Sequence, residues 1–232
     1  MQKSMVSLLS VADSVSIINA IFGLLAIIIL FGNFGLDLNI QIRVSFSLIL
    51  LALLADGVDG IFARKFGKSE IGVILDSMAD MTSFVIAPSI FIYFVYSNTT
   101  DFLLFYRHIY LIAALILFLS FGIIRLASFH LMKKNEFFIG LPTPASTIVL
   151  LNLAYLEIEF IYILPAVVIF GAAMASNIKF PKPRIRMDLI ATILIFLTLI
   201  LGKSYYAIAP LLLLSAMIIY ILIGPIFYKK FV

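Results

Sequence analysis

The stretch "ADGVDGIFARKFGKSEIGVILDSMADMTSF", residues 55–84, concentrates acidic side chains in an otherwise apolar chain. It contains Asp56 and Asp59, three residues apart, and Asp76 and Asp80, four residues apart. In helices, each pair would share one face, because residues three and four apart are neighbours on a helix surface. Only a short turn separates the pairs, which predicts an antiparallel helix hairpin in which all four carboxylates converge.

The composition indicates an all-α integral membrane protein. Of the 232 residues, 64% are hydrophobic and only 12% are charged. Apolar runs of about 20 residues are long enough to cross ~30 Å of hydrocarbon as helices. We expect a bundle of about eight transmembrane helices. Two of them are short for a full crossing, so the expected range is six to eight. The helices are expected over residues 12–32, 42–65, 70–96, 106–132, 141–156, 160–178, 187–202 and 205–227.

The distribution of basic residues predicts the orientation of this bundle. With eight crossings, twelve of the sixteen Lys and Arg residues fall on one side, Arg43, Arg107 and Lys203 fall on the other, and Arg125 lies within the fourth helix. The positive-inside rule then makes both termini cytoplasmic and gives a multi-pass protein of the cell membrane. The basic side collects Lys3, Arg64, Lys65, Lys68, Lys133, Lys134, Lys179, Lys182, Arg184, Arg186, Lys229 and Lys230.

We expect a single transmembrane domain over residues 1–232, because no linker, low-complexity tract or obvious repeat divides the chain. Residues 1–12 combine Lys3 with alternating Ser and Leu, a pattern compatible with a short helix in the membrane interface. The net charge of +4 fits contact with anionic membrane lipids and requires no nucleic-acid partner.

The four aspartates indicate a metal site that opens to the cytoplasmic side. One Asp at the centre of a membrane helix costs roughly 2.5 to 3.5 kcal/mol on insertion scales. Four carboxylates this close could not all ionise unaided. The chain has no Cys and only two His, far apart, so oxygen ligands remain, and these suit Mg²⁺ or Mn²⁺. Gly and Ala on the same faces either pack helices closely or leave room for a ligand, and both can hold.

The pattern Asp56-x-x-Asp59-Gly60-x-x-Ala63-Arg64, followed by Gly72-x-x-x-Asp76-x-x-x-Asp80, resembles the signature of the CDP-alcohol phosphotransferase family. Eight fixed positions fall within 25 residues, so the match is specific. Seven residues separate Arg64 from Gly72, one fewer than in the common pattern. We expect the turn to absorb this difference without loss of a ligand.

This resemblance implies two divalent cations, Mg²⁺ or Mn²⁺, and a catalytic base. By analogy with the family, Asp56, Asp59 and Asp76 hold one ion, and Asp56, Asp76 and Asp80 hold the second. Asp80 also takes the proton of an alcohol, whose oxygen attacks the β-phosphorus of a CDP-linked lipid while CMP leaves. The family also implies a homodimer.

The same resemblance implies where the CDP moiety binds. Cytidine and ribose would approach the backbone at Gly60, Ala63 and Gly72, and Arg64 would pair with the phosphates or hold an aspartate.

Four further segments look like those of the CDP-diacylglycerol serine phosphatidyltransferases: residues 75–89, 123–129, 138–146 and 174–184. They favour L-serine as the acceptor over inositol phosphate, glycerol phosphate or choline-type alcohols. The third, "FIGLPTPAS", equally fits an ordinary Gly and Pro break. The donor is CDP-diacylglycerol or CDP-archaeol, which the residues do not distinguish.

Arg125 and Lys133 are the candidate contacts for serine or phosphate. Arg125 either anchors an anion in the cavity or pairs with a structural carboxylate. Lys133 has a plainer interpretation as a positive-inside loop charge. A different class of function, a cation or proton-coupled transporter, would also use intramembrane acids. Against it, all four acids lie in one hairpin, and we detect no inverted repeat.

Overall fold

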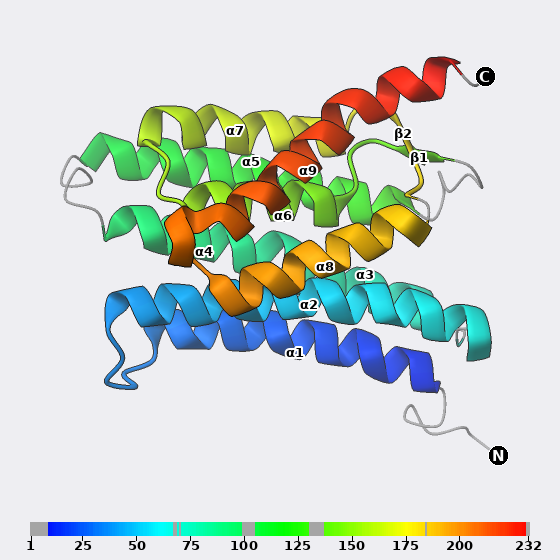
Figure 1. Ribbon diagram of the computed structural model, residues 1–232, viewed down its shortest axis with the longest axis horizontal. Helices are drawn as coiled ribbons and strands as arrows, with labels where there is room; N and C mark the ends of the chain where they lie inside the picture. Colours follow the sequence, from blue (N-terminus) through cyan, green and yellow to red (C-terminus); the bar gives the residue numbers. More distant parts are fainter. Residues whose placement is uncertain are drawn as a thin grey trace.

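Figure 1 shows the computed structural model, a bundle whose long helices run side by side. It describes residues 9–66, 69, 71–98, 105–129, 137–183 and 185–230. Most of the expected interfacial helix over residues 1–12 therefore lies outside the described residues. Leu9 and Ser10 are not helical, and the first helix begins directly after them.

All eight expected hydrophobic helices occur among the described residues. Five are long and apolar enough to cross a membrane, and residues Phe160–Met174 and Met187–Leu201 form shorter apolar helices. The chain thus has the helices of a multi-pass membrane protein, while the exact number of crossings stays a prediction. The elements are α1 (Val11–Phe31), α2 (Leu38–Phe66), α3 (Gly72–Asp80), η2 (Met81–Ile86), α4 (Ala87–Ser97), α5 (Phe105–Phe129), β1 (Phe137–Ile139), α6 (Thr143–Tyr155), α7 (Phe160–Met174), β2 (Lys179–Pro181), α8 (Ile185–Leu201) and α9 (Ser204–Lys230).

A capping box fixes the start of α1. The Asp13 N–H donates to Ser10 Oγ at 3.3 Å, and the Ser10 N–H donates to Asp13 Oδ2 at 2.6 Å. These two bonds satisfy backbone donors that a helix start otherwise leaves open. Asp13 is therefore buried at the start of the helix instead of reaching into solvent.

The third hydrophobic segment is one helix whose middle widens into a π-helical turn, η2, directly after Asp80. Pro88 has no N–H, so the Phe84 carbonyl loses the donor that an α-helix would supply four residues further on. The buried Thr147 hydroxyl of α6 donates to that carbonyl at 2.6 Å. A side chain from another helix thus completes the backbone of the helix that carries Asp76 and Asp80.

The helices pack around a core rich in aromatic side chains. In the view of Figure 1, α1 and α2 form the lower side of the bundle, and α5, α7 and α9 form the upper side. Phe46 of α2 stacks on Tyr155 of α6, with ring centroids 3.9 Å apart. Phe91 of α4 and Phe118 of α5 are also fully buried. Contacts among α2, α4 and α6 join the two sides.

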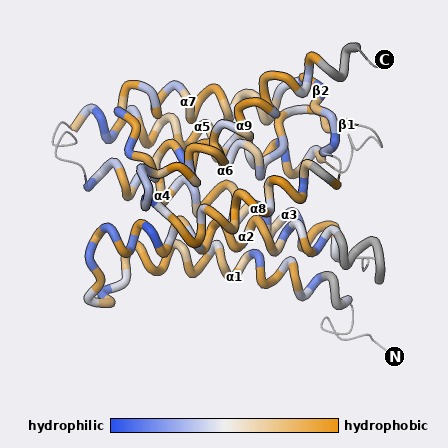
Figure 2. Tube along the Cα trace, viewed as in Figure 1, coloured by the Kyte–Doolittle hydropathy of each residue, from blue (hydrophilic) through white to orange (hydrophobic). Residues whose placement is uncertain are grey.

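Polarity is distributed as expected for a protein surrounded by lipid. Figure 2 shows hydrophobic residues over most of the length of the helices. Large apolar side chains such as Leu24 and Phe105 are exposed, at 51% and 77%, whereas Asp13 and Asn19 are 1% exposed. Polar groups in hydrocarbon are stable only when partners surround them, so their burial among the helices follows.

The two ends of the bundle differ in charge. The start of α1, the end of α9 and the β1–β2 pair lie at one end, on the right of Figure 1. Lys179 and Lys182 belong to that end, in and directly after β2. At the other end, Arg43 donates to the Ile200 carbonyl at 3.3 Å, and Lys203 forms an ion pair with Glu157. Among the described residues, the two sides expected from sequence correspond to these two ends.

A short antiparallel strand pair, which the sequence did not predict, joins two loops. Phe138 pairs with Phe180 in its centre. The pairing brings together parts of the segments 138–146 and 174–184, and the paired Phe138 and Phe180 are 42 positions apart in the chain. Gly140 follows β1 with a φ of +77°, and a Cβ there would collide with the Met174 carbonyl. The conformation and close packing of this loop therefore require glycine at position 140, so Gly140 does more than interrupt a helical pattern.

We expect Thr147→Val to destabilise the protein by about 1 to 3 kcal/mol, because it conserves shape but removes the hydroxyl that donates to the buried Phe84 carbonyl and also lies 3.0 Å from the Thr143 carbonyl of its own helix. Thermal unfolding in detergent would measure the loss. Thr198→Val is the matched control: that buried hydroxyl bonds to the Leu194 carbonyl of its own helix at 2.8 Å, and this carbonyl keeps its intrahelical donor. Equal losses in the two variants would contradict the role of Thr147.

Candidate functional site

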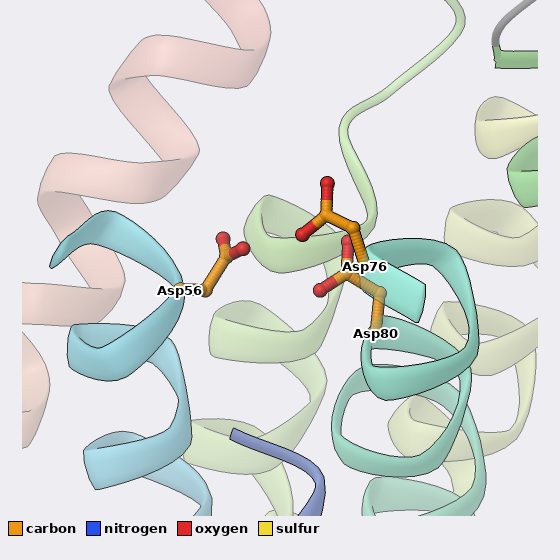
Figure 3. A group of neighbouring side chains, drawn as sticks. All are labelled: Asp56, Asp76 and Asp80. Atoms are coloured by element: carbon orange, nitrogen blue, oxygen red, sulfur yellow. The ribbon is translucent and has the colours of Figure 1, made fainter. Parts of the chain in front are cut away.

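Three carboxylates meet between α2 and α3. Asp56, Asp76 and Asp80 each offer one oxygen, and these oxygens all lie within 4.8 Å of one another. Asp76 and Asp80 are one turn apart on the same face of α3, and Figure 3 shows Asp56 facing them from α2. All three are half-buried. The antiparallel hairpin expected from the spacing of the aspartates therefore brings these three side chains together.

The geometry of this group fits a divalent cation with oxygen ligands. Mg²⁺ binds oxygens at about 2.0 to 2.1 Å, so two oxygens on opposite sides of it are roughly 4.2 Å apart. The observed limit of 4.8 Å requires little further approach. Three like charges this close repel one another unless a cation or proton neutralises them. Asp56, Asp76 and Asp80 are thus the residues that would hold such an ion.

Asp59 lies one turn further along α2 and has a different environment. It is 1% exposed, and its Oδ2 accepts a hydrogen bond from Ser16 Oγ of α1 at 2.8 Å. Asp59 does not belong to the group of three oxygens described above. Of the two expected ligand sets, the structure brings together the one made of Asp56, Asp76 and Asp80. A second ion that also uses Asp59 stays a prediction.

Two glycines of the family signature have different surroundings. A Cβ at Gly60 would meet nothing within 4 Å, so the backbone of α2 faces open space there. A Cβ at Gly72 would collide with the Asp13 carboxylate and lie 3.3 Å from Ser69 Oγ. Gly60 thus leaves room for a ligand, whereas Gly72 allows α1 to pack closely against the start of α3.

Two of the expected CDP contacts, Ala63 and Arg64, belong to the last turns of α2. Their side chains are outside the described part of the molecule, as is the whole of Lys133. Their expected roles stay predictions.

Arg125 of α5 is buried inside the bundle. It is 6% exposed, and its Nε donates to the Leu141 carbonyl at 3.4 Å. Its guanidinium lies over the Phe129 ring, 5.0 Å from the centroid, and its charge interacts with that of Asp80. Arg125 therefore places a buried positive charge whose field acts on Asp80, and its role as an anion contact or a structural partner stays a prediction.

Helix α1 contributes polar side chains that the sequence analysis did not identify as part of the site. Asp13, Ser16 and Asn19 follow one another at intervals of three and are buried. Ser16 donates to Asp59, and Asn19 Nδ2 donates to Asp80 Oδ1 at 3.2 Å. The signal was present in the sequence, because three polar residues on one face of an apolar span indicate polar partners inside the bundle.

The sequence around this acidic hairpin matches one known protein family. The sequence model described as CDP-alcohol phosphatidyltransferase matches residues 9–178, which include the acidic hairpin and β1 and end directly before β2. The chain belongs to this family. Membership confirms the resemblance inferred from the signature, and it gives no support to a transporter.

Several members of the CDP-alcohol phosphatidyltransferase family are similar over most of their length. A CDP-diacylglycerol–serine O-phosphatidyltransferase of Methanocaldococcus jannaschii is 36% identical over 176 residues, covering 75% of each chain. An archaetidylserine synthase of Methanothermobacter thermautotrophicus is 33% identical over 190 residues, 78% of this chain and 73% of the relative. A CDP-diacylglycerol–serine O-phosphatidyltransferase of Helicobacter pylori is 31% identical over 177 residues, 70% of this chain and 72% of the relative.

We expect Asp76→Asn to weaken Mn²⁺ binding by about 100-fold or more, since loss of an outer hydrogen-bond partner alone typically costs 10- to 100-fold. Titration of the detergent-purified protein with Mn²⁺, followed by electron paramagnetic resonance, would measure the affinity. Asp37→Asn, at an exposed site before α2, is the control and should leave the affinity unchanged. Equal Mn²⁺ affinity in the Asp76 and Asp37 variants would argue against a metal site in the hairpin.

Proposed function

We propose that this protein transfers a phosphatidyl-type group from a CDP-linked lipid to the hydroxyl of L-serine, releasing CMP, in phospholipid biosynthesis. The observation that carries the proposal is the convergence of Asp56, Asp76 and Asp80 within the family's signature. The serine acceptor is supported by relatives whose names specify serine transfer, with diacylglycerol or archaetidyl lipids. The same chemistry with inositol phosphate or glycerol phosphate is the alternative.

The aspartates of the hairpin have two proposed roles, metal binding and proton transfer. Asp56, Asp59 and Asp76 would hold one divalent cation, and Asp56, Asp76 and Asp80 would hold the second. Bound Mg²⁺ or Mn²⁺ would supply positive charge that offsets the charge developing on the diphosphate. Asp80 takes the proton from the serine hydroxyl as its oxygen forms a bond to the β-phosphorus. The bond from that phosphorus to the bridging oxygen breaks, and CMP leaves with the electron pair.

Neighbouring residues bind and orient the substrates. The nucleotide occupies the open space beside Gly60, with Ala63 along the same path and Arg64 on the phosphates. The Asp13 carboxylate lies where a side chain at Gly72 would be, so the nucleotide contacts Gly72 only through its backbone. Arg125 contacts the serine carboxylate or a phosphate, because it is a buried guanidinium next to the proposed base. Lys133 is a second contact for the same groups.

The protein is proposed to work as a multi-pass protein of the cytoplasmic membrane, with residues 1–232 forming one domain. The excess of basic residues at the end of the bundle that carries the site supports a cytoplasmic opening and cytoplasmic termini. The lipid chains of CDP-diacylglycerol or CDP-archaeol remain in the membrane. The family resemblance supports a homodimer.

CMP release by the detergent-purified protein tests the proposal. With CDP-diacylglycerol and Mg²⁺ or Mn²⁺, we expect release that depends on L-serine and falls about 100-fold or more in Asp80→Asn, as for loss of a general base. Parallel reactions contain inositol phosphate or glycerol phosphate, and a second series uses CDP-archaeol. Release with another acceptor would correct the substrate, whereas no release with any donor and acceptor would refute the transferase assignment.

Gly60→Leu should raise the KM for the CDP-lipid roughly tenfold, because the added side chain fills the proposed nucleotide space and overpacking typically costs 1 to 3 kcal/mol. Gly57→Leu is the matched control, since a Cβ there also meets nothing within 4 Å but points away from the Asp56 face. Initial rates at varied lipid concentration give both KM values. Similar values for the two variants would show that the nucleotide binds elsewhere.

A further inference from the structure

We propose that Asn19 of α1 is a positioning residue for Asp80, holding the carboxylate in the orientation that it needs as base and ligand. The inference rests on the proposed function and adds a helix outside the signature to the active site. Asn19 is 1% exposed, and its Nδ2 donates to Asp80 Oδ1 at 3.2 Å.

The orientation of the Asn19 amide follows from electrostatics. A carboxylate only accepts hydrogen bonds, so the amide NH₂ must face Asp80, because the amide oxygen would be repelled. A hydrogen bond to a charged group is stronger than one between neutral groups. The amide therefore fixes one oxygen of Asp80 and leaves the other for the metal group and the alcohol.

The backbone around Asn19 is held against the same helix. Ser83 Oγ, in the π-helical turn after Asp80, donates to the Asn19 carbonyl at 2.8 Å. One turn further along α1, a Cβ at Gly23 would lie only 2.8 Å from the Ser83 Cα. Gly23 thus permits an approach that any larger residue would prevent. Both contacts hold the α1 backbone against η2, directly after Asp80, so the Asn19 side chain starts from a fixed position close to the carboxylate.

The two polar ends of the Asn19 amide differ in their partners. Oδ1 is buried and has no hydrogen-bond partner among the described residues. The buried Asn152 has the same unpaired Oδ1, so this oxygen alone does not identify a functional residue. Asn19 differs in its Nδ2, which reaches the Asp80 carboxylate of another helix, whereas Asn152 Nδ2 bonds to the Ile148 carbonyl of its own helix. An apolar side chain at position 19 could not make that contact.

Asn19→Leu tests the proposal, because Leu has a similar volume and cannot donate. We expect kcat for serine-dependent CMP release to fall 10- to 100-fold, as for other partners that orient metal ligands, with KM for the CDP-lipid changed less than threefold. Mn²⁺ affinity, measured without substrates, should fall by a similar factor. Asn152→Leu is the matched control: Asn152 is equally buried, but its Nδ2 bonds to the Ile148 carbonyl of its own helix.

A double-mutant cycle separates positioning from general destabilisation. In an Asp80→Asn background, Asn19→Leu should weaken Mn²⁺ binding no further, because its partner carboxylate is gone. Additive effects, or turnover and Mn²⁺ affinity within twofold of the Asn152→Leu control, would overturn the proposal. If Asn19→Leu does not fold, Asn19→Ser, which is too short to reach Asp80, replaces it. If the wild-type protein transfers nothing to serine, the proposed function fails, while the Mn²⁺ cycle still decides the role of Asn19.

Discussion

The rest of the structure depends on one constraint: several negatively charged side chains lie close together inside an apolar helix bundle. Three carboxylates lie within 4.8 Å of one another, at the junction of two helices surrounded by hydrocarbon-like side chains. Two neighbouring helices provide groups that compensate for negative charge in the hairpin. Helix α1 provides hydroxyl and amide donors, and α5 provides the buried guanidinium of Arg125. The arrangement of helices around the hairpin follows from the need to keep these polar groups together.

Much of the fold and the centre of the site were predictable from sequence, because they depend on local patterns. Apolar runs located all eight helices, since length and hydrophobicity suffice for membrane segments. The spacing of Asp76 and Asp80 placed them on one face, since helix periodicity alone fixes that. The signature of eight residues identified the family.

The features that were missed depend on partners far away in the chain. The bond from Asn19 to Asp80 joins residues 61 positions apart, and nothing local specifies it. The β1–β2 strands have only three residues each, too few for a recognisable alternation. Pro88 is visible in the sequence, yet the hydroxyl that bonds to the carbonyl four residues before it comes from Thr147 of another helix. Gly60 and Gly72 look alike in the signature, and only their surroundings distinguish open space from close packing.

The strand pair also connects two loops by hydrogen bonds. Beyond the strands, the Gly140 N–H donates to the Ile178 carbonyl at 2.8 Å, and the Leu141 N–H donates to the Ala173 carbonyl at 2.9 Å. The Leu141 carbonyl in turn accepts the bond from Arg125. A continuous series of hydrogen bonds therefore runs from the paired loops through Leu141 to Arg125, whose charge interacts with that of Asp80. The position of this buried cation thus depends on a loop contact that is distant from the aspartates in the sequence.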